Sequence, residues 1–296
     1  DLAPADYQAV CQQTLALCKK LGDRFAILDV QAGDVAAFRE HIGTADLAYA
    51  AAYHPYLITA LTHRYDEQQV TLSEGDKQTT LAAIATTNTS RYNRIKKQLA
   101  EQRVILPPSA AIAGIYARTD RERGVWKAPA NVSLSAVVGP TVQITHEQQE
   151  GLNVDPNSGK SINAIRAFPG KGTLVWGART LAGNDNEWRY VPIRRLFIMI
   201  EESARKATSF AVFEPNDATT WLKVKGMLES YLYGLWEQGA LQGSTPEAAY
   251  YVNVGLGKTM SQQDVLEGKM VVEIAVAAVR PAEFIILRFS HKLIEA

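Results

Sequence analysis

The chain has 296 residues, 47% of them apolar, which is enough for one large or two smaller domains with a substantial core and excludes a disordered or fibrous protein. No apolar run approaches the roughly 20 residues needed to span a bilayer. Lysine plus arginine and aspartate plus glutamate are equal at 31 each, so no global charge draws the chain to nucleic acid or to an anionic membrane.

The first predicted element is a helix from Asp6 to Lys20, because its apolar residues recur at helical spacing. Its two cysteines, Cys11 and Cys18, are separated by roughly 10 Å on such a helix, which is too far for a disulfide. We expect reduced, buried thiols in a bacterial-type cytoplasm and no export leader. The predicted buried stripe consists of Tyr7, Val10, Cys11, Thr14, Leu17 and Cys18.

Strands and helices then alternate, which predicts an α/β layer architecture. Residues 24–30 and 48–57 are predicted strands, the second broken near Pro55, with a short helix from Asp34 between them. A polar excursion follows at residues 58–80, and a basic helix then runs to about residue 103. A solvated helix face and a docking surface for an acidic partner both remain open for its basic residues, Arg91, Arg94, Lys96, Lys97 and Arg103.

Loops are expected to dominate residues 107–190, around short strands at 112–116, 141–144 and 174–177. Pro192 then opens an amphipathic helix, and Asn216 or Asp217 caps another that ends at Gly239. Strands are predicted at 250–254 and 271–279. The predicted fold class is therefore α/β, or α+β, with a mixed β-sheet packed against amphipathic helices. The two predicted helix stripes hold Ile193, Leu196, Phe197, Ile200, Ala204 and Ala207, and Trp221, Val224, Leu228, Tyr231 and Leu235.

The end of the chain is the most informative segment. After Arg280–Glu283, apolar residues alternate with polar ones, which predicts a half-buried strand at the very end. It either closes its own domain or pairs with the sheet of a neighbouring molecule, since an unpaired apolar edge is an aggregation hazard. We interpret it as the arm of a polymer subunit, with a core domain at 1–280 and a linker and arm at 281–296. The arm strand consists of Phe284, Ile285, Ile286, Leu287, Arg288, Phe289, Ser290, His291, Lys292 and Leu293.

The sequence carries no convincing pattern for catalysis, a cofactor or a metal. Two Gly-Lys-Ser/Thr segments, 159–161 and 257–259, suggest phosphate binding, but Val154 and Val252 replace the upstream glycine that a phosphate loop needs. The five histidines show no zinc spacing. Asp29, at the end of a predicted strand, is interpreted as a buried or capping residue. We therefore predict no catalytic, cofactor-binding or metal-binding residues.

Tryptophan and arginine gather in the middle of the sequence. They could line a ligand pocket, but Arg–Trp stacking also pins long loops to a scaffold, and we favour the structural interpretation. The residues concerned are Trp126, Trp176, Trp188, Arg166, Arg179 and Arg189.

The loop motifs together resemble contractile tail sheath proteins. The residues that we assign to the family motif, with structural roles, are Trp126, Pro129, Asn163, Arg166, Trp176, Arg179, Trp188, Pro281 and Glu283. The sequence of 175–190, 254–260 and 287–292 is most similar to sheaths of extracellular contractile injection systems. The matching segments run in family order from residue 48 to the C-terminus: 106–120, 124–131, 162–166, 175–181, 188–191, 213–216, 239–243 and 280–285.

The resemblance implies a non-enzymatic subunit that polymerises helically around an inner tube and contracts to drive the tube into a target cell. It implies assembly in the bacterial cytoplasm, later release in a phage-tail-like particle, and strand-donating arms at both ends. The implied partners are other copies or paralogues of the chain, the inner tube, and baseplate and terminator proteins, without nucleic acid, membrane insertion or cofactor. Since almost nothing precedes Asp6, we expect the N-terminal arm to be trimmed, disordered or lacking.

Two rival interpretations follow from the same residues. An α/β hydrolase-like or nucleotide-binding protein would gather Asp29, His54 and Lys258 in one pocket. A tube or baseplate protein of the same machines would show a closed β-barrel in place of two long helices on a sheet.

Overall fold

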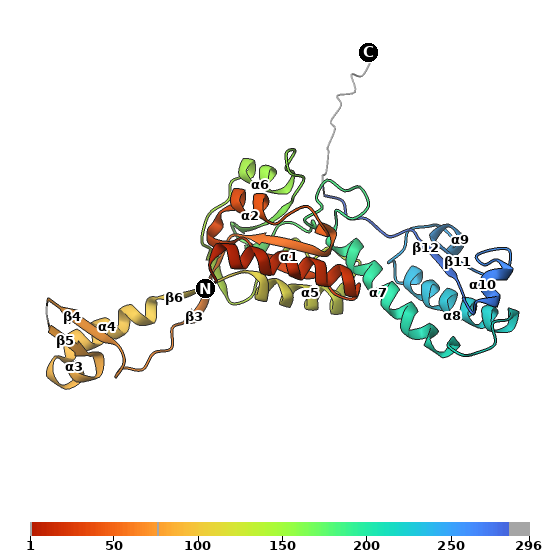
Figure 1. Cartoon of the computed structure of the whole chain (residues 1–296). Helices are drawn as coiled ribbons and strands as arrows, with labels where there is room; N and C mark the ends of the chain where they lie inside the picture. Colours follow the sequence, from red (N-terminus) through yellow and green to blue (C-terminus); the bar gives the residue numbers. More distant parts are fainter. Residues whose placement is uncertain (1, 76, 284–296) are drawn as a thin grey trace, which may run out of the picture. The chain divides into compact units, whose positions relative to one another are not determined.

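The structure is a computed structural model that describes residues 2–75 and 77–283 (Figure 1). These residues form two compact units, which we call unit 1 and unit 2. Unit 1 holds the chain up to Leu21, Phe25–Arg118 and Pro129–Arg189. Unit 2 holds Gly22–Arg24, Thr119–Ala128 and the chain from Tyr190 onward. The mixed α/β class is confirmed, while the predicted arm, Phe284 to Leu293, lies outside the described residues.

Unit 1 is built on a five-stranded mixed sheet in the order β1-β2-β9-β10-β7. β2 is parallel to β1 and to β9, whereas β10 pairs antiparallel with β9 and β7. All five residues of β2 are buried, as expected for a central strand of a covered sheet. The strands are β1 (Ala26–Asp29), β2 (Ala50–His54), β7 (Val132–Ser133), β9 (Ile162–Phe168) and β10 (Gly172–Val175).

Helices of unit 1 are tied to this sheet by tyrosine hydroxyls. The Tyr7 hydroxyl donates to the Asp29 carbonyl at 2.8 Å, and the hydroxyls of Tyr53 and Tyr116 lie 2.7 Å apart. The helices are α1 (Pro4–Leu21), α2 (Val35–His41), α5 (Ser109–Arg123) and α6 (His146–Asn153), with 3-10 turns at Gln31–Gly33 and Leu47–Tyr49.

The first helix forms as predicted, but its buried stripe differs. Cys11 and Cys18 are buried free thiols, and Leu15 lies between them. Val10 and Leu17, which we expected to be buried, are each 47% exposed. The i, i+4, i+7 spacing of the three buried residues defines a narrower stripe, which leaves both neighbours outside it.

Residues 112–116 are helical, so the strand predicted there is wrong. They lie in α5, whose first backbone N–H, that of Ser109, donates to the Asp29 carboxylate at 2.8 Å. This contact confirms Asp29 as a capping residue. Ile112, Ile115 and Thr119 are buried at helical spacing. The prediction failed because a short apolar run does not distinguish a strand from a buried helix segment.

The strand predicted at 141–144 is also wrong, because the strand is β8 (Val137–Pro140) instead. The residues after it lead into α6, which Thr145 and Gln148 open with a reciprocal capping box. The strand predicted at 174–177 begins earlier and ends at Val175.

Unit 1 contains an insertion between two paired strands. β3 (Leu57–Thr62) pairs antiparallel with β6 (Arg103–Leu106) and with β8, and Thr62 is the register partner of Arg103. The excursion predicted at 58–80 thus begins within β3 and continues through α3 and α4 to β6. Between the paired strands lie β4 (Thr71–Glu74), β5 (Lys77–Thr80), α3 (Leu81–Thr87) and α4 (Thr89–Glu101).

Two residues of the basic run on α4 form ion pairs within this insertion. Arg91 lies 2.7 Å from Glu74, and Lys96 lies 2.8 Å from Glu67. Such exposed pairs contribute little to stability. They are typical of a solvated helix face.

Unit 2 packs two long helices against a hairpin, as predicted. Asp217, and not Asn216, caps α8 by accepting from the backbone N–H groups of Thr219 and Thr220 at 3.0 Å. The core includes Leu196, Ile200, Val224, Leu228, Leu232 and Val252. The elements are α7 (Val191–Ala207), α8 (Ala218–Glu237), α9 (Pro246–Ala249), β11 (Tyr250–Val254), α10 (Gln262–Leu266) and β12 (Val272–Val276), with a 3-10 turn at Thr208–Ala211.

Buried His54, at the end of β2, makes the stability of unit 1 depend on pH. It is 8% exposed, its Nδ1 has no hydrogen-bond partner, and burial lowers its pKa. Below about pH 6.5, the ordinary pKa of histidine, His54 therefore binds a proton more readily in the unfolded chain than in the folded protein. The contribution of neutral His54 to the free energy of unfolding is fully present above about pH 6.5. It is lost as the pH falls toward the lowered pKa of His54 in the folded protein.

We expect His54→Met to reduce the loss of unfolding free energy between about pH 7.5 and about pH 5.5, measured by urea unfolding. Exposed His63 supplies the matched control, His63→Met, which should leave the pH dependence unchanged. Equal pH dependence in wild type and His54→Met would contradict the assignment.

Candidate functional site: a buried polar network around the sheath-like motifs

Asn163 is the central residue of the motif region. It is 1% exposed, on β9, and its amide nitrogen donates to the carbonyls of Ala52 at 3.1 Å and Arg179 at 2.8 Å. Its amide oxygen accepts from the Arg179 backbone N–H at 2.8 Å. One side chain therefore joins β2, β9 and the loop after β10. Gly177 allows this approach, because a Cβ there would lie 2.7 Å from the Asn163 amide oxygen.

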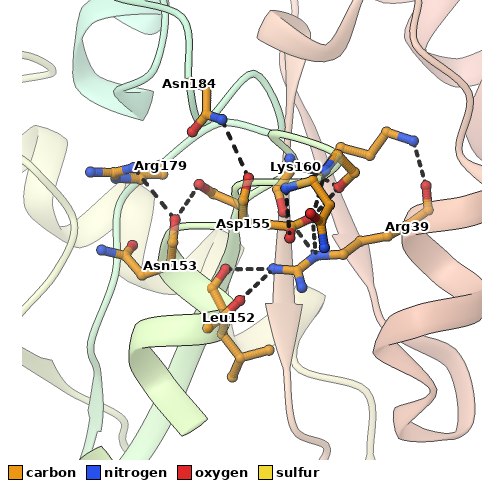
Figure 2. Close-up of polar contacts among 11 residues, drawn as sticks. Arg39, Leu152, Asn153, Asp155, Lys160, Arg179 and Asn184 are labelled. Carbon is orange, nitrogen blue, oxygen red and sulfur yellow. Dashed lines mark hydrogen bonds and ion pairs between the residues drawn. The ribbon is translucent and has the colours of Figure 1, made fainter. Parts of the chain in front are cut away.

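The C-terminal end of α6 is closed by two arginines from elsewhere in the chain (Figure 2). Arg39, on α2, donates to the carbonyls of Gly151 and Leu152 at 2.9 Å each. Arg179 donates to the Asn153 carbonyl at 3.4 Å and to the Gly183 carbonyl at 3.1 Å. These carbonyls of α6 lack helical partners and carry partial negative charge, so cations stabilise them.

Asp155 and Lys160 complete this network in the loop after α6. Arg39 Nε lies 3.7 Å from the Asp155 carboxylate and donates to the Lys160 carbonyl at 3.0 Å. The Lys160 ammonium donates to the Arg39 carbonyl. Burial works to raise the pKa of Asp155, but hydrogen bonds from Ser158 and the Arg39 charge together hold it below its usual value. Burial lowers the pKa of Lys160.

Replacing Arg39 by methionine should lower the free energy of unfolding of unit 1 by about 3 kcal/mol. The substitution leaves the Leu152 and Gly151 carbonyls of α6 without this donor and Asp155 without the Arg39 cation, while methionine keeps the apolar stem. Urea unfolding measures the effect. Arg94→Met, on the exposed surface of α4, is the control and should change stability by less than about 0.5 kcal/mol. Equal stabilities of the two variants would show that the network contributes nothing.

Aromatic rings lie close together at the ends of β9 and β10. The Arg166 guanidinium lies 5.2 Å from the Phe168 ring centroid, and that centroid lies 4.6 Å from the Trp176 ring centroid. The Trp188 backbone donates to Asp185 at 3.0 Å, and its carbonyl accepts from Thr180. The Arg166 contact is with a phenylalanine and these Trp188 contacts use its backbone, so the predicted Arg–Trp stacking stays a prediction.

The remaining motif residues are distributed over both units. Pro129 is buried in unit 1 and Trp126 packs against the core of unit 2. Pro281 is half-buried in unit 2, and the Glu283 carboxylate accepts from the Tyr190 hydroxyl at 3.1 Å. The motif residues thus serve several local structures. Arg39 and Asp155 belong to these structures but were missed, because no local pattern links residues so distant in sequence. Tyr190 lies in the matching segment 188–191 but was given no role of its own.

The two Gly-Lys segments have structural partners. Lys160 and Ser161 bond to backbone carbonyls of Arg39 and Asn153, and Thr259 bonds to the carbonyl of Val271 at 2.7 Å. Among the described residues no group of three metal-ligating side chains occurs, and no helix is long and apolar enough to cross a bilayer.

The described motif side chains contact the protein's own backbone and rings. The family model for the phage tail sheath protein central domain matches residues 17–181, and that for the phage tail sheath C-terminal domain matches residues 183–292. The chain therefore belongs to the phage tail sheath family. The two matches meet close to the boundary between units at residues 189 and 190.

Solved relatives come from contractile injection systems. A chain of the anti-feeding prophage baseplate structure is 39% identical, with a TM-score of 0.74, over 97% of this chain and 65% of that one. A chain of the contracted PVC sheath complex, an extracellular contractile injection system, is 36% identical, with a TM-score of 0.73, over 95% of this chain and 68% of that one.

Curated sequences agree on the family. The tail sheath protein of Vibrio phage KVP40 is 24% identical over 188 residues, which are 62% of this chain and 26% of that protein. The chain thus spans only about a quarter of that relative.

Proposed function

We propose that the chain is a structural subunit of a contractile sheath that polymerises helically around an inner tube and contracts to drive the tube through a target cell envelope. The observation that carries this proposal is the similarity to the contracted PVC sheath chain, at 36% identity over 95% of this chain. Both units take part in that similarity, since so little of the chain lies outside it.

The balanced charge is consistent with this function. The 31 basic and 31 acidic residues leave no net charge to oppose the packing of many copies. Contraction without a nucleotide requires that the extended lattice has the higher free energy and is held by a barrier. Complementary charged patches between copies would help to lower the free energy of the contracted lattice, although each exposed pair is weak.

The proposal includes partners, location and boundaries. The partners are further copies or paralogues of the chain, the tube, the baseplate and a terminator, and the protein acts without catalysis. Assembly takes place in the bacterial cytoplasm, before the particle is released. The linker and arm begin at residue 281, and the arm residues Phe284 to Leu293 add a strand to a neighbouring copy.

Electron microscopy of the purified protein tests the function. Hollow, helically ridged cylinders are the expected result, and persistent monomers at high concentration would contradict it. Turnover of a nucleotide by the purified chain would instead favour the enzyme alternative.

A further inference from the structure

The backbone that leads to the arm is fixed in unit 2 as far as Val279. β12 pairs with β11, and the chain after it continues along residues 240–242. The Gln242 N–H donates to the Ala277 carbonyl at 2.7 Å, and the Val279 N–H donates to the Ala240 carbonyl at 3.2 Å. The position of residue 279 is therefore set by main-chain hydrogen bonds.

Between Val279 and Glu283 the backbone of two residues is restricted. Pro281 fixes its own φ, and a residue before proline, here Arg280, is restricted to extended conformations. A contact at Glu283 therefore further limits the directions that the chain can take at that point.

Tyr190 supplies that contact from a rigid position. Its hydroxyl donates to the Glu283 carboxylate at 3.1 Å, across 93 residues of sequence. Tyr190 is the N-cap of α7, and its carbonyl accepts from the backbone N–H groups of Ile193 and Arg194 at 3.1 and 3.2 Å. The first residues of α7, Val191 to Ile193, are buried in the unit. A hydrogen bond to a carboxylate is stronger than one between neutral groups.

We propose that the Tyr190–Glu283 hydrogen bond anchors the root of the C-terminal arm and sets the direction in which the arm leaves its own subunit. Tyr190 is then a positioning residue for the contact between copies. This inference rests on the proposed sheath function. A strand reaches a neighbour's sheet in register only if its starting point is fixed, because a slip of one residue turns its apolar face away.

The variant Tyr190→Phe removes the hydroxyl, and Glu283→Ala removes the carboxylate that accepts from it. We expect each to raise the protein concentration needed for polymer formation by about tenfold, measured by sedimentation. The effects of the two single variants should add to more than the effect of the double variant, since the shared hydrogen bond is lost in all three. Glu283→Gln keeps an acceptor and should retain most of the assembly. Tyr251→Phe, at an exposed tyrosine of β11, is the matched control.

A second measurement separates anchoring from folding and from polymer formation. Spin labels on Ala282→Cys and Ser230→Cys report the distance from the arm root to α8 in dilute protein, and both positions are exposed. The native Cys11 and Cys18 are buried, and serine replaces them if they take up label. The distance distribution should be narrow in wild type and Tyr251→Phe, and broad in Tyr190→Phe and Glu283→Ala.

The outcomes of these experiments distinguish failure of the sheath function from failure of the Tyr190–Glu283 anchor. If wild type forms no polymer, the sheath function fails, while the label distances still test the anchor. Normal assembly by Tyr190→Phe or Glu283→Ala, with or without a broadened distance, overturns the inference. A lower melting temperature with normal assembly would identify the contact as merely structural. If Tyr190→Phe does not fold, Glu283→Ala carries the test alone.

Discussion

Replacing Asn163 by alanine should lower the free energy of unfolding of unit 1 by about 4 kcal/mol, which is a large part of the stability of a typical domain. The side chain is 1% exposed and bonds to the Ala52 carbonyl, the Arg179 carbonyl and the Arg179 N–H. All three backbone groups would lose their hydrogen bond to the Asn163 side chain in the interior. Each such group costs about 1 to 3 kcal/mol.

Urea unfolding followed by circular dichroism measures this loss, and Asn93→Ala on the exposed surface of α4 is the control. Asn163→Asp keeps an acceptor for the Arg179 N–H but loses both donors, so it should also be strongly destabilised. A loss below about 1 kcal/mol for Asn163→Ala would show that the three bonds are replaced by water or by rearrangement.

Deleting residues 284–296 should abolish polymer formation while both units remain folded. The deletion leaves every described helix and strand in place, and it removes the apolar alternation of Ile285, Leu287 and Phe289. If the arm pairs with a neighbouring sheet, its loss removes main-chain hydrogen bonds as well as apolar contacts. We expect the concentration needed for polymer to rise by at least about a hundredfold.

The two faces of the arm supply matched variants for this experiment. Replacing Ile285, Leu287 and Phe289 by serine should reproduce the deletion. Replacing Arg288, Ser290 and Lys292 by threonine, on the opposite face of the alternation, should leave assembly close to wild type. Unchanged cylinders after the deletion would refute the role of the arm.

Long amphipathic elements were predictable from the sequence because their own periodicity specifies them. The helices that begin at Val191 and Ala218 and the strand at Tyr250–Val254 were found for this reason. Asp29, at the end of a strand, was predicted to be either buried or capping, and the structure shows the capping contact. The apolar residues 112–116 were misassigned, because their helical form depends on a cap that lies 80 residues away.

The polar network could be predicted only in part. Family resemblance selected Asn163 and Arg179, but their partners are mostly backbone groups, which leave no trace in residue identity. Arg39 was missed because its targets, the carbonyls of α6, lie 112 and 113 residues away in sequence. Only the folded backbone brings these groups together.

The pairing of Thr62 with Arg103 has a consequence for how sheath proteins diversify. Since the two strands that enter and leave the insertion are direct neighbours, the stretch between them is a cassette with fixed ends. A tight turn or a foreign domain with adjacent termini would join the same ends without displacing β3 or β6. Both natural variation and protein engineering can therefore exchange the segment between Thr62 and Arg103 while the pairing of β3 with β6 stays the same.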